Sequence, residues 1–88
     1  MRVTVHLYAR LRELAGRSEW TCQVPAGATV ADVWQALASA YPPVRELDAA
    51  VSAAVNADFA SRKTPVHDGD EVAFLPPVSG GADVRARP

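Results

Sequence analysis

The stretch TVADVWQALASAY, residues 29–41, holds the clearest secondary-structure signal in the chain and decides its fold class. Thr29 is a favoured N-cap residue, and Asp32, three positions later, makes an acidic variant of the capping box. Apolar side chains recur at helical spacing and form one stripe: Val30, Val33, Trp34, Leu37 and Tyr41. Pro42 and Pro43 end the pattern. The stretch therefore predicts one long amphipathic helix that buries a single face.

Before this helix, residues 3–8 and 19–24 alternate apolar and polar side chains with the period of a β-strand. After it, residues 51–56 predict a third strand and residues 71–75 the last one. Residues 9–15, followed by Gly16, predict a short helix with a glycine cap, residues 44–47 a further short turn, and Ala57–Asp58 a tight turn before Phe59. Strands grouped around one long helix predict an α+β domain, with a sheet of four to five strands packed on one main helix.

Composition narrows the class of protein. The chain has 88 residues, 49% hydrophobic and 22% charged, which is typical of one globular domain. Its net charge of −1 gives no general attraction to nucleic acid or to an anionic membrane, and we expect neither as a partner. One cysteine excludes an internal disulfide and a four-cysteine metal site. No apolar run approaches the roughly 20 residues of a membrane span, and no signal peptide opens the chain, so we expect a cytoplasmic protein.

The isolated reactive side chains do not form a recognisable active site. His6 and His67 lack the spacing of a metal-binding pair, and we expect both at the surface. Cys22 lies on an apolar strand face, which predicts a buried and unreactive thiol. A solvated loop explains the acidic cluster within residues 68–71. We therefore expect no metal site and no independent catalyst.

The segment after the last predicted strand has a different character. Pro76 and Pro77 favour an extended chain, after which Val78-Ser79-Gly80-Gly81 loses side-chain bulk step by step. Six extended residues reach roughly 20 Å beyond the sheet. A stiff base with a thin tip suits insertion into a channel of another protein, because a glycine backbone passes where no Cβ fits. A Gly-Gly pair by itself is more often a plain tail.

Four stretches carry a resemblance to a known family: VHLYARLRELAG (5–16), ATVADV (28–33), AVN (54–56) and DGDEVAFLPPVSGG (68–81). In this order they resemble the small subunit of molybdopterin synthase, the MoaD family, over nearly all of residues 1–81. The resemblance implies a β-grasp, ubiquitin-like fold, in agreement with the element order above. It divides the chain into a β-grasp domain (1–75), a Gly-Gly tail (76–81) and an extension beyond the family terminus (82–88).

The resemblance also implies a sulfur carrier of molybdenum cofactor biosynthesis, in which Gly81 becomes a thiocarboxylate. An adenylating enzyme of the ubiquitin-activating type (MoeB-like) would activate the Gly81 carboxylate with ATP, and a sulfur donor system would supply the sulfur. A large subunit (MoaE-like), in a heterotetramer, would receive the tail through Pro77, Ser79 and Gly80. There the sulfur would attack cyclic pyranopterin monophosphate. The chain itself would be a non-catalytic subunit and sulfur co-substrate, without a bound cofactor.

Residues 82–88 depart from the family pattern. With them in place, Gly81 ends in an amide carbonyl instead of a carboxylate and cannot be adenylated. Three explanations remain open: a protease removes the extension, the extension is a remnant, or the chain is not a working carrier. We favour removal or a remnant.

Strand alternation predicts a docking surface. Tyr8 and Leu75 point away from the core faces of their strands, and Phe59 follows a turn. With Arg12 beside them, these three would form an apolar patch, and the matching positions of the resembled family contact the large subunit and the activating enzyme. The alternative is that Tyr8 or Phe59 covers a second side of the core.

Two other functions remain open on the same fold. One is a sulfur carrier for a thiamin, cysteine or tRNA-thiolation pathway, and the other is a ubiquitin-like interaction module whose tail is never activated. The chain length to Gly81 and the Pro-Pro-Val-Ser before the glycines favour the molybdenum pathway.

Overall fold

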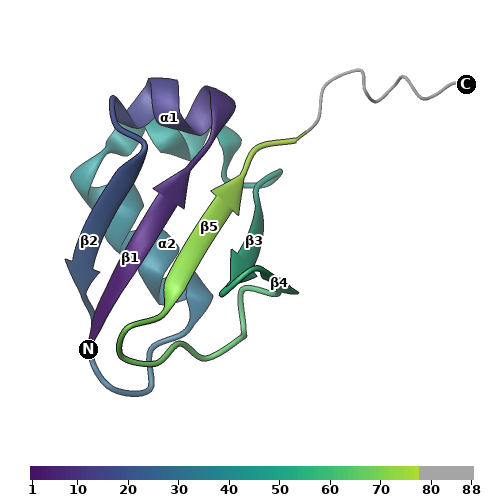
Figure 1. Ribbon diagram of the computed structural model, residues 1–88. Coiled ribbons are helices and arrows are strands. Elements are labelled where there is room, and N and C mark those ends of the chain that lie inside the picture. Colours follow the sequence, from purple (N-terminus) through teal and green to yellow (C-terminus); the bar gives the residue numbers. More distant parts are fainter. Residues whose placement is uncertain (78–88) are drawn as a thin grey trace, which may run out of the picture.

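A five-stranded mixed sheet carries the fold of residues 1–77, the part of the chain that the computed structural model describes (Figure 1). The elements are β1 (Arg2–Leu7), α1 (Ala9–Ala15), β2 (Glu19–Gln23), α2 (Val30–Ala40), the 3₁₀ helix η1 (Pro42–Leu47), β3 (Ser52–Val55), β4 (Asp58–Ala60) and β5 (Glu71–Leu75). The strand order is β2-β1-β5-β3-β4, with β1 and β5 parallel and every other pair antiparallel. This is the predicted α+β, β-grasp architecture.

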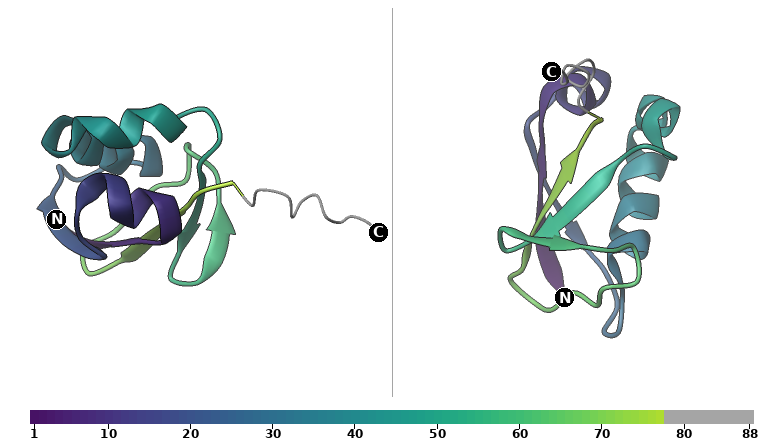
Figure 2. Two further views of the ribbon diagram at one scale, coloured as in Figure 1. Left: turned by 90° about the horizontal axis from the view of Figure 1, so that it is seen from above. Right: turned by 90° about the vertical axis from the view of Figure 1, so that its right-hand side faces the viewer.

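Two layers face each other across one core. The right-hand view of Figure 2 shows α2 along one side of the sheet, while the other side carries no helix among residues 1–77. The inner strand residues are fully buried beneath α2: Val3, Val5, Leu7, Val72 and Phe74. Trp34 of α2 meets Phe74 edge-on, with ring centroids 5.1 Å apart. The helical stripe and the strand alternation thus meet where the sequence predicts.

Both ends of α2 follow from local chemistry. The backbone N–H of Thr29 donates to Oδ2 of Asp32 at 2.8 Å, which is the predicted capping pair. At the other end, Pro42 and Pro43 stop α2 but do not lead into an irregular loop. They begin η1, since their fixed φ angles suit the first positions of a helix, and η1 buries Val44 against the core. The short turn predicted at 44–47 is therefore part of a longer 3₁₀ helix, which begins two residues earlier.

The connection between β3 and β4 differs from the prediction by one residue. Asn56 and Ala57 occupy the turn, with left-handed φ angles of +50° and +73°, and β4 already begins at Asp58. The expected Ala57–Asp58 turn is therefore wrong, and Phe59 lies within a strand instead of after a turn. The short helix α1 ends as predicted, because Gly16 adopts φ +79° at its C-cap.

Candidate functional site

The sheet face opposite α2, here called the open face, brings together side chains from four strands. His6 of β1 lies beside Ala73 of β5, Ala73 beside Ala54 of β3, and Ala54 beside Phe59 of β4. These residues span positions 6 to 73 of the sequence yet form one row across the sheet, because strand neighbours in register share a face.

Two large apolar side chains of the open face are exposed, Tyr8 by 49% and Phe59 by 86%. The alternative that either one covers a second side of the core is wrong. Tyr8 follows β1 in extended conformation, so it continues the alternation that points His6 outward. Leu75 is half-buried and lies beside Ser52 of β3, next to the inward-facing Phe74. The three predicted patch residues therefore share the open face.

Arg12 lies one helical turn after Tyr8. Its backbone N–H donates to the Tyr8 carbonyl at 3.4 Å, and its side chain is exposed on α1. The tail starts from the same end of the molecule. Because β1 and β5 are parallel, both strands finish at the same end of the sheet (Figure 1). Leu7 pairs with Phe74, so Tyr8 follows β1 at the end where Leu75, Pro76 and the exposed Pro77 continue β5. Ser79, Gly80 and Gly81 lie outside the described residues.

A hollow of about 400 Å³ opens on this face. Its lining residues come from β1, β5 and the β3–β4 turn: His6, Tyr8, Asn56, Ala57, Glu71 and Ala73. Oε1 of Glu71 lies 3.0 Å from Nε2 of His6, and Oε1 of Glu19 lies 4.0 Å from Nδ1 of the same ring. Sequence analysis missed this hollow. A signal was present, because the alternation of side chains along each strand places His6 on the same face as Tyr8, and Ala73 on the same face as Leu75.

The hydrogen bonds of Asn56 hold the wall of the hollow. Its Nδ2 donates to Oδ1 of Asp70 at 2.9 Å, and its Oδ1 accepts from the backbone N–H of Glu71 at 3.0 Å. The amide of Asn56, together with the backbone N–H of His67, lowers the pKa of the Asp70 carboxyl. Asp70 therefore stays ionised at neutral pH and anchors the turn beside the hollow.

The remaining reactive groups stand apart from this face. Cys22 is buried on the inner side of β2, and burial raises the pKa of its thiol, so it carries little thiolate. Across residues 1–77 no three His, Cys, Asp or Glu side chains are grouped so that they could hold a metal ion. Nor is any helix of that part long and apolar enough to cross a membrane.

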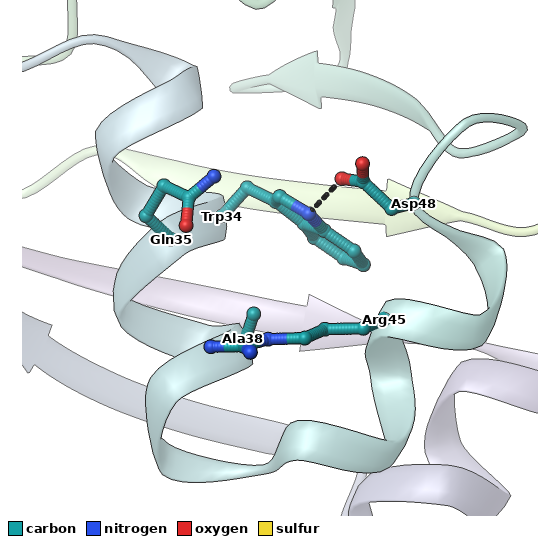
Figure 3. A pocket seen from close by; sticks show the side chains of 5 residues that line it. All are labelled: Trp34, Gln35, Ala38, Arg45 and Asp48. Atoms are coloured by element: carbon teal, nitrogen blue, oxygen red, sulfur yellow. Dashed lines mark hydrogen bonds between the residues drawn. The ribbon is translucent and has the colours of Figure 1, made fainter.

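A second hollow, of about 330 Å³, lies on the helical side and is lined by Trp34, Gln35, Ala38, Arg45 and Asp48 (Figure 3). Trp34 Nε1 donates to Asp48, as Figure 3 shows. Arg62 donates to the Asp48 carbonyl at 2.7 Å and stacks over the Trp34 ring, with its guanidinium carbon 5.3 Å from the ring centroid. These contacts fasten the loop after β4 to α2, so we assign them to the fold.

Comparison with known proteins identifies the family. The family model described as "ThiS family" matches residues 5–81. The chain belongs to this family. Its match ends at Gly81, so residues 82–88 of this ThiS-family chain lie outside it.

Named relatives and solved structures agree with this assignment. The molybdopterin synthase sulfur carrier subunit of Arabidopsis thaliana is 33% identical, over 92% of this chain and 84% of the relative. That of Escherichia coli is 36% identical, over 90% and 99%. The crystal structure of SAMP1 from Haloferax volcanii superposes with a TM-score of 0.84 at 31% identity, over 92% of this chain and 100% of the other. The BexX/CysO complex of Amycolatopsis orientalis gives a TM-score of 0.68 at 26% identity, over 90% and 99%.

Proposed function

We propose that this chain is the sulfur carrier of a molybdopterin synthase, and that Gly81 bears the sulfur as a thiocarboxylate. The observation that carries the proposal is the family match, which continues through the tail and stops at Gly81. It is joined by 33–36% identity to proteins named as molybdopterin synthase sulfur carrier subunits.

In this proposal the reacting atom of the chain is the carboxyl carbon of Gly81. A carboxylate is a poor acyl donor, so an activating enzyme first joins Gly81 to AMP, using ATP and releasing pyrophosphate. A sulfur nucleophile then attacks the acyl carbon, AMP leaves, and reduction of the sulfur donor's S–S bond by a thiol frees the thiocarboxylate. In the large subunit that sulfur attacks cyclic pyranopterin monophosphate. The chain contributes no catalytic side chain and binds no cofactor.

The open face supplies docking in this proposal. Tyr8, Phe59 and Leu75 pack against the large subunit and, at another stage, against the activating enzyme, with Arg12 at the edge. Full burial of an exposed large apolar side chain contributes roughly 1.5–3 kcal/mol, so these residues are candidates for the main anchors of the complex. Pro77, Ser79 and Gly80 guide the tail into the partner's channel, and two carriers join two large subunits in a heterotetramer.

Residues 82–88 require one earlier step. Hydrolysis of the Gly81–Ala82 peptide bond transfers the oxygen of water to the Gly81 carbonyl and releases the amine of Ala82. Only then does Gly81 carry the carboxylate that adenylation consumes. In this proposal the 88-residue chain is thus a precursor.

ATP–pyrophosphate exchange with the activating enzyme tests this proposal. We expect no exchange for the 88-residue chain and clear exchange for a chain that ends at Gly81. Gly81→Ala in the shortened chain is the matched control, and it should lose most of the exchange, since its methyl group must enter a channel shaped for bare backbone. The intact mass of the native protein should correspond to a chain that ends at Gly81. In part of the protein, this mass should include one sulfur atom in place of an oxygen atom. Exchange by the 88-residue chain equal to that of the shortened one would contradict the precursor step.

The similarity to SAMP1, a small archaeal modifier protein, favours a second candidate function. In that case the activated Gly81 would join an amine of another protein through an amide bond. The native protein would then appear in mass spectra as a Gly81 remnant on lysine side chains, which a dedicated sulfur carrier would not leave.

A further inference from the structure

The carboxylate of Glu71 lines the hollow on the open face. The Glu71 side chain is 65% exposed, and its Oε1 is engaged with His6. The carboxylate of Glu19 approaches the same imidazole from β2. Two acidic side chains therefore share one histidine on this part of the face.

The floor of the hollow is apolar. Ala73 faces outward from the centre of β5, and its neighbour in register, Ala54, leaves the surface low at this point because both side chains are small. Tyr8 and the Asn56–Ala57 turn also line the hollow. A long apolar stem with a cationic head matches this combination of alanine floor, aromatic wall and carboxylate.

The wall is fixed before any partner arrives. The backbone N–H of Asn56 donates to the Glu71 carbonyl at 2.8 Å, and the Asn56 side chain bonds both Glu71 and Asp70. A preformed hollow costs little ordering free energy when it is filled.

We propose that this hollow receives an arginine side chain of the protein that docks on the open face. The stem of the arginine lies on Ala73, and its guanidinium lies between the Tyr8 ring and the carboxylate of Glu71. This proposal rests on the proposed function and adds the chemistry of the partner's anchor.

Desolvation favours a cation. A partner side chain that fills the hollow beside Tyr8 also lies against Glu71, because both residues line it. Burial of a carboxylate without a compensating charge is costly, and one histidine, 3.0 Å from Glu71 and 4.0 Å from Glu19, stands beside two carboxylates. A guanidinium is favoured over an ammonium group because its plane stacks on an aromatic ring while its N–H groups bond a carboxylate.

Binding of the chain to the large subunit of molybdopterin synthase tests this inference. The dissociation constant is measured by calorimetry for the full chain and for the chain ending at Gly81. Glu71→Gln keeps the shape and the hydrogen bond to His6, and we expect about tenfold weaker binding with a smaller salt dependence. The matched control is Glu46→Gln, an exposed carboxylate on η1 that pairs with Arg10 at 3.4 Å, and it should change binding less than about twofold.

A second variant probes the shape of the hollow without a change of charge. Ala73→Leu places a larger side chain on the floor, and we expect about tenfold weaker binding with an unchanged unfolding midpoint. Replacement of each surface arginine of the large subunit by Met should then identify one whose effect is non-additive with Glu71→Gln. Coupling to a lysine only, or to no cationic residue, would overturn the arginine assignment.

Phe59→Asp separates failure of this inference from failure of the proposed function. If Phe59→Asp weakens binding while Glu71→Gln and Ala73→Leu bind as the unmodified chain does, the arginine anchor is wrong and the docking face stands. If the unmodified chain does not bind the large subunit at all, both are wrong.

Discussion

The two faces of the sheet are built from the same strands but differ in almost every property. Phe74 is fully buried against Trp34, whereas its neighbour Leu75 lies on the open face. Likewise Leu7 is buried in the core, and Tyr8, the next residue, is half exposed. Folding and docking are therefore carried by alternate residues of one backbone, so single substitutions can disturb either one separately.

Substitution of the inner face should have the largest effect. Phe74→Ala removes the ring that Trp34 packs against, and we expect a loss of about 3–5 kcal/mol of unfolding free energy. A chain of this length has about 4–13 kcal/mol in total, so the loss is a large share of it and urea denaturation should find a much lower midpoint. Phe74→Leu is the control and should cost about 1 kcal/mol. A Phe74→Ala protein as stable as the unmodified chain would show that α2 does not cover this face.

The neighbouring residue should give the opposite result. Leu75→Asp is expected to weaken binding to the large subunit by about tenfold or more, since burial of one large apolar side chain contributes roughly 1.5–3 kcal/mol. Circular dichroism should show an intact fold. Phe59→Asp, at the most exposed apolar position of the face, is the parallel variant. Undiminished affinity in calorimetric titration of both variants would remove the open face as the docking surface.

Most of the fold can be predicted from the sequence because its signals are local. The stripe of α2, its capping pair and the alternation along β1 and β5 each lie within about a dozen consecutive residues. The misplaced turn had no such signal. Left-handed turns usually contain glycine, but here Asn56 and Ala57 adopt that conformation, and β4 is only three residues long.

The site was predictable only in part. The alternation of side chains along a strand places Tyr8 and Leu75 on the open face. The structure adds that Phe59 lies on the same face, in β4. Prediction of the hollow requires more than this alternation. His6 and Glu71 are 65 residues apart and meet only through the register of β1 with β5. The sequence pattern carries no information on that register until the sheet order is known.

Cys22 tests whether a residue of the inner face contributes only to stability. Its thiol is buried and its pKa is raised, so we expect it to take no part in sulfur transfer. Cys22→Ala should cost about 1 kcal/mol of stability, measured by urea denaturation, and should retain full thiocarboxylate formation at Gly81. Loss of thiocarboxylate in a variant that remains folded would assign the thiol a chemical role.

The smallest expected effect is a gain in stability at the border of the open face. Ala57 holds φ +73°, a conformation that costs an L-residue roughly 1–2 kcal/mol and glycine almost nothing. Ala57→Gly relieves that cost but gives the unfolded chain more freedom, so the net gain should be about 0.5–1 kcal/mol. Ala36→Gly, in the interior of α2, has no such strain to relieve and should lose about 1 kcal/mol. Urea denaturation should therefore show a gain in unfolding free energy for Ala57→Gly and a loss for Ala36→Gly, although both replace alanine by glycine. If both variants lose stability equally, Ala57 does not hold the left-handed turn in solution, and the wall of the hollow is not preformed.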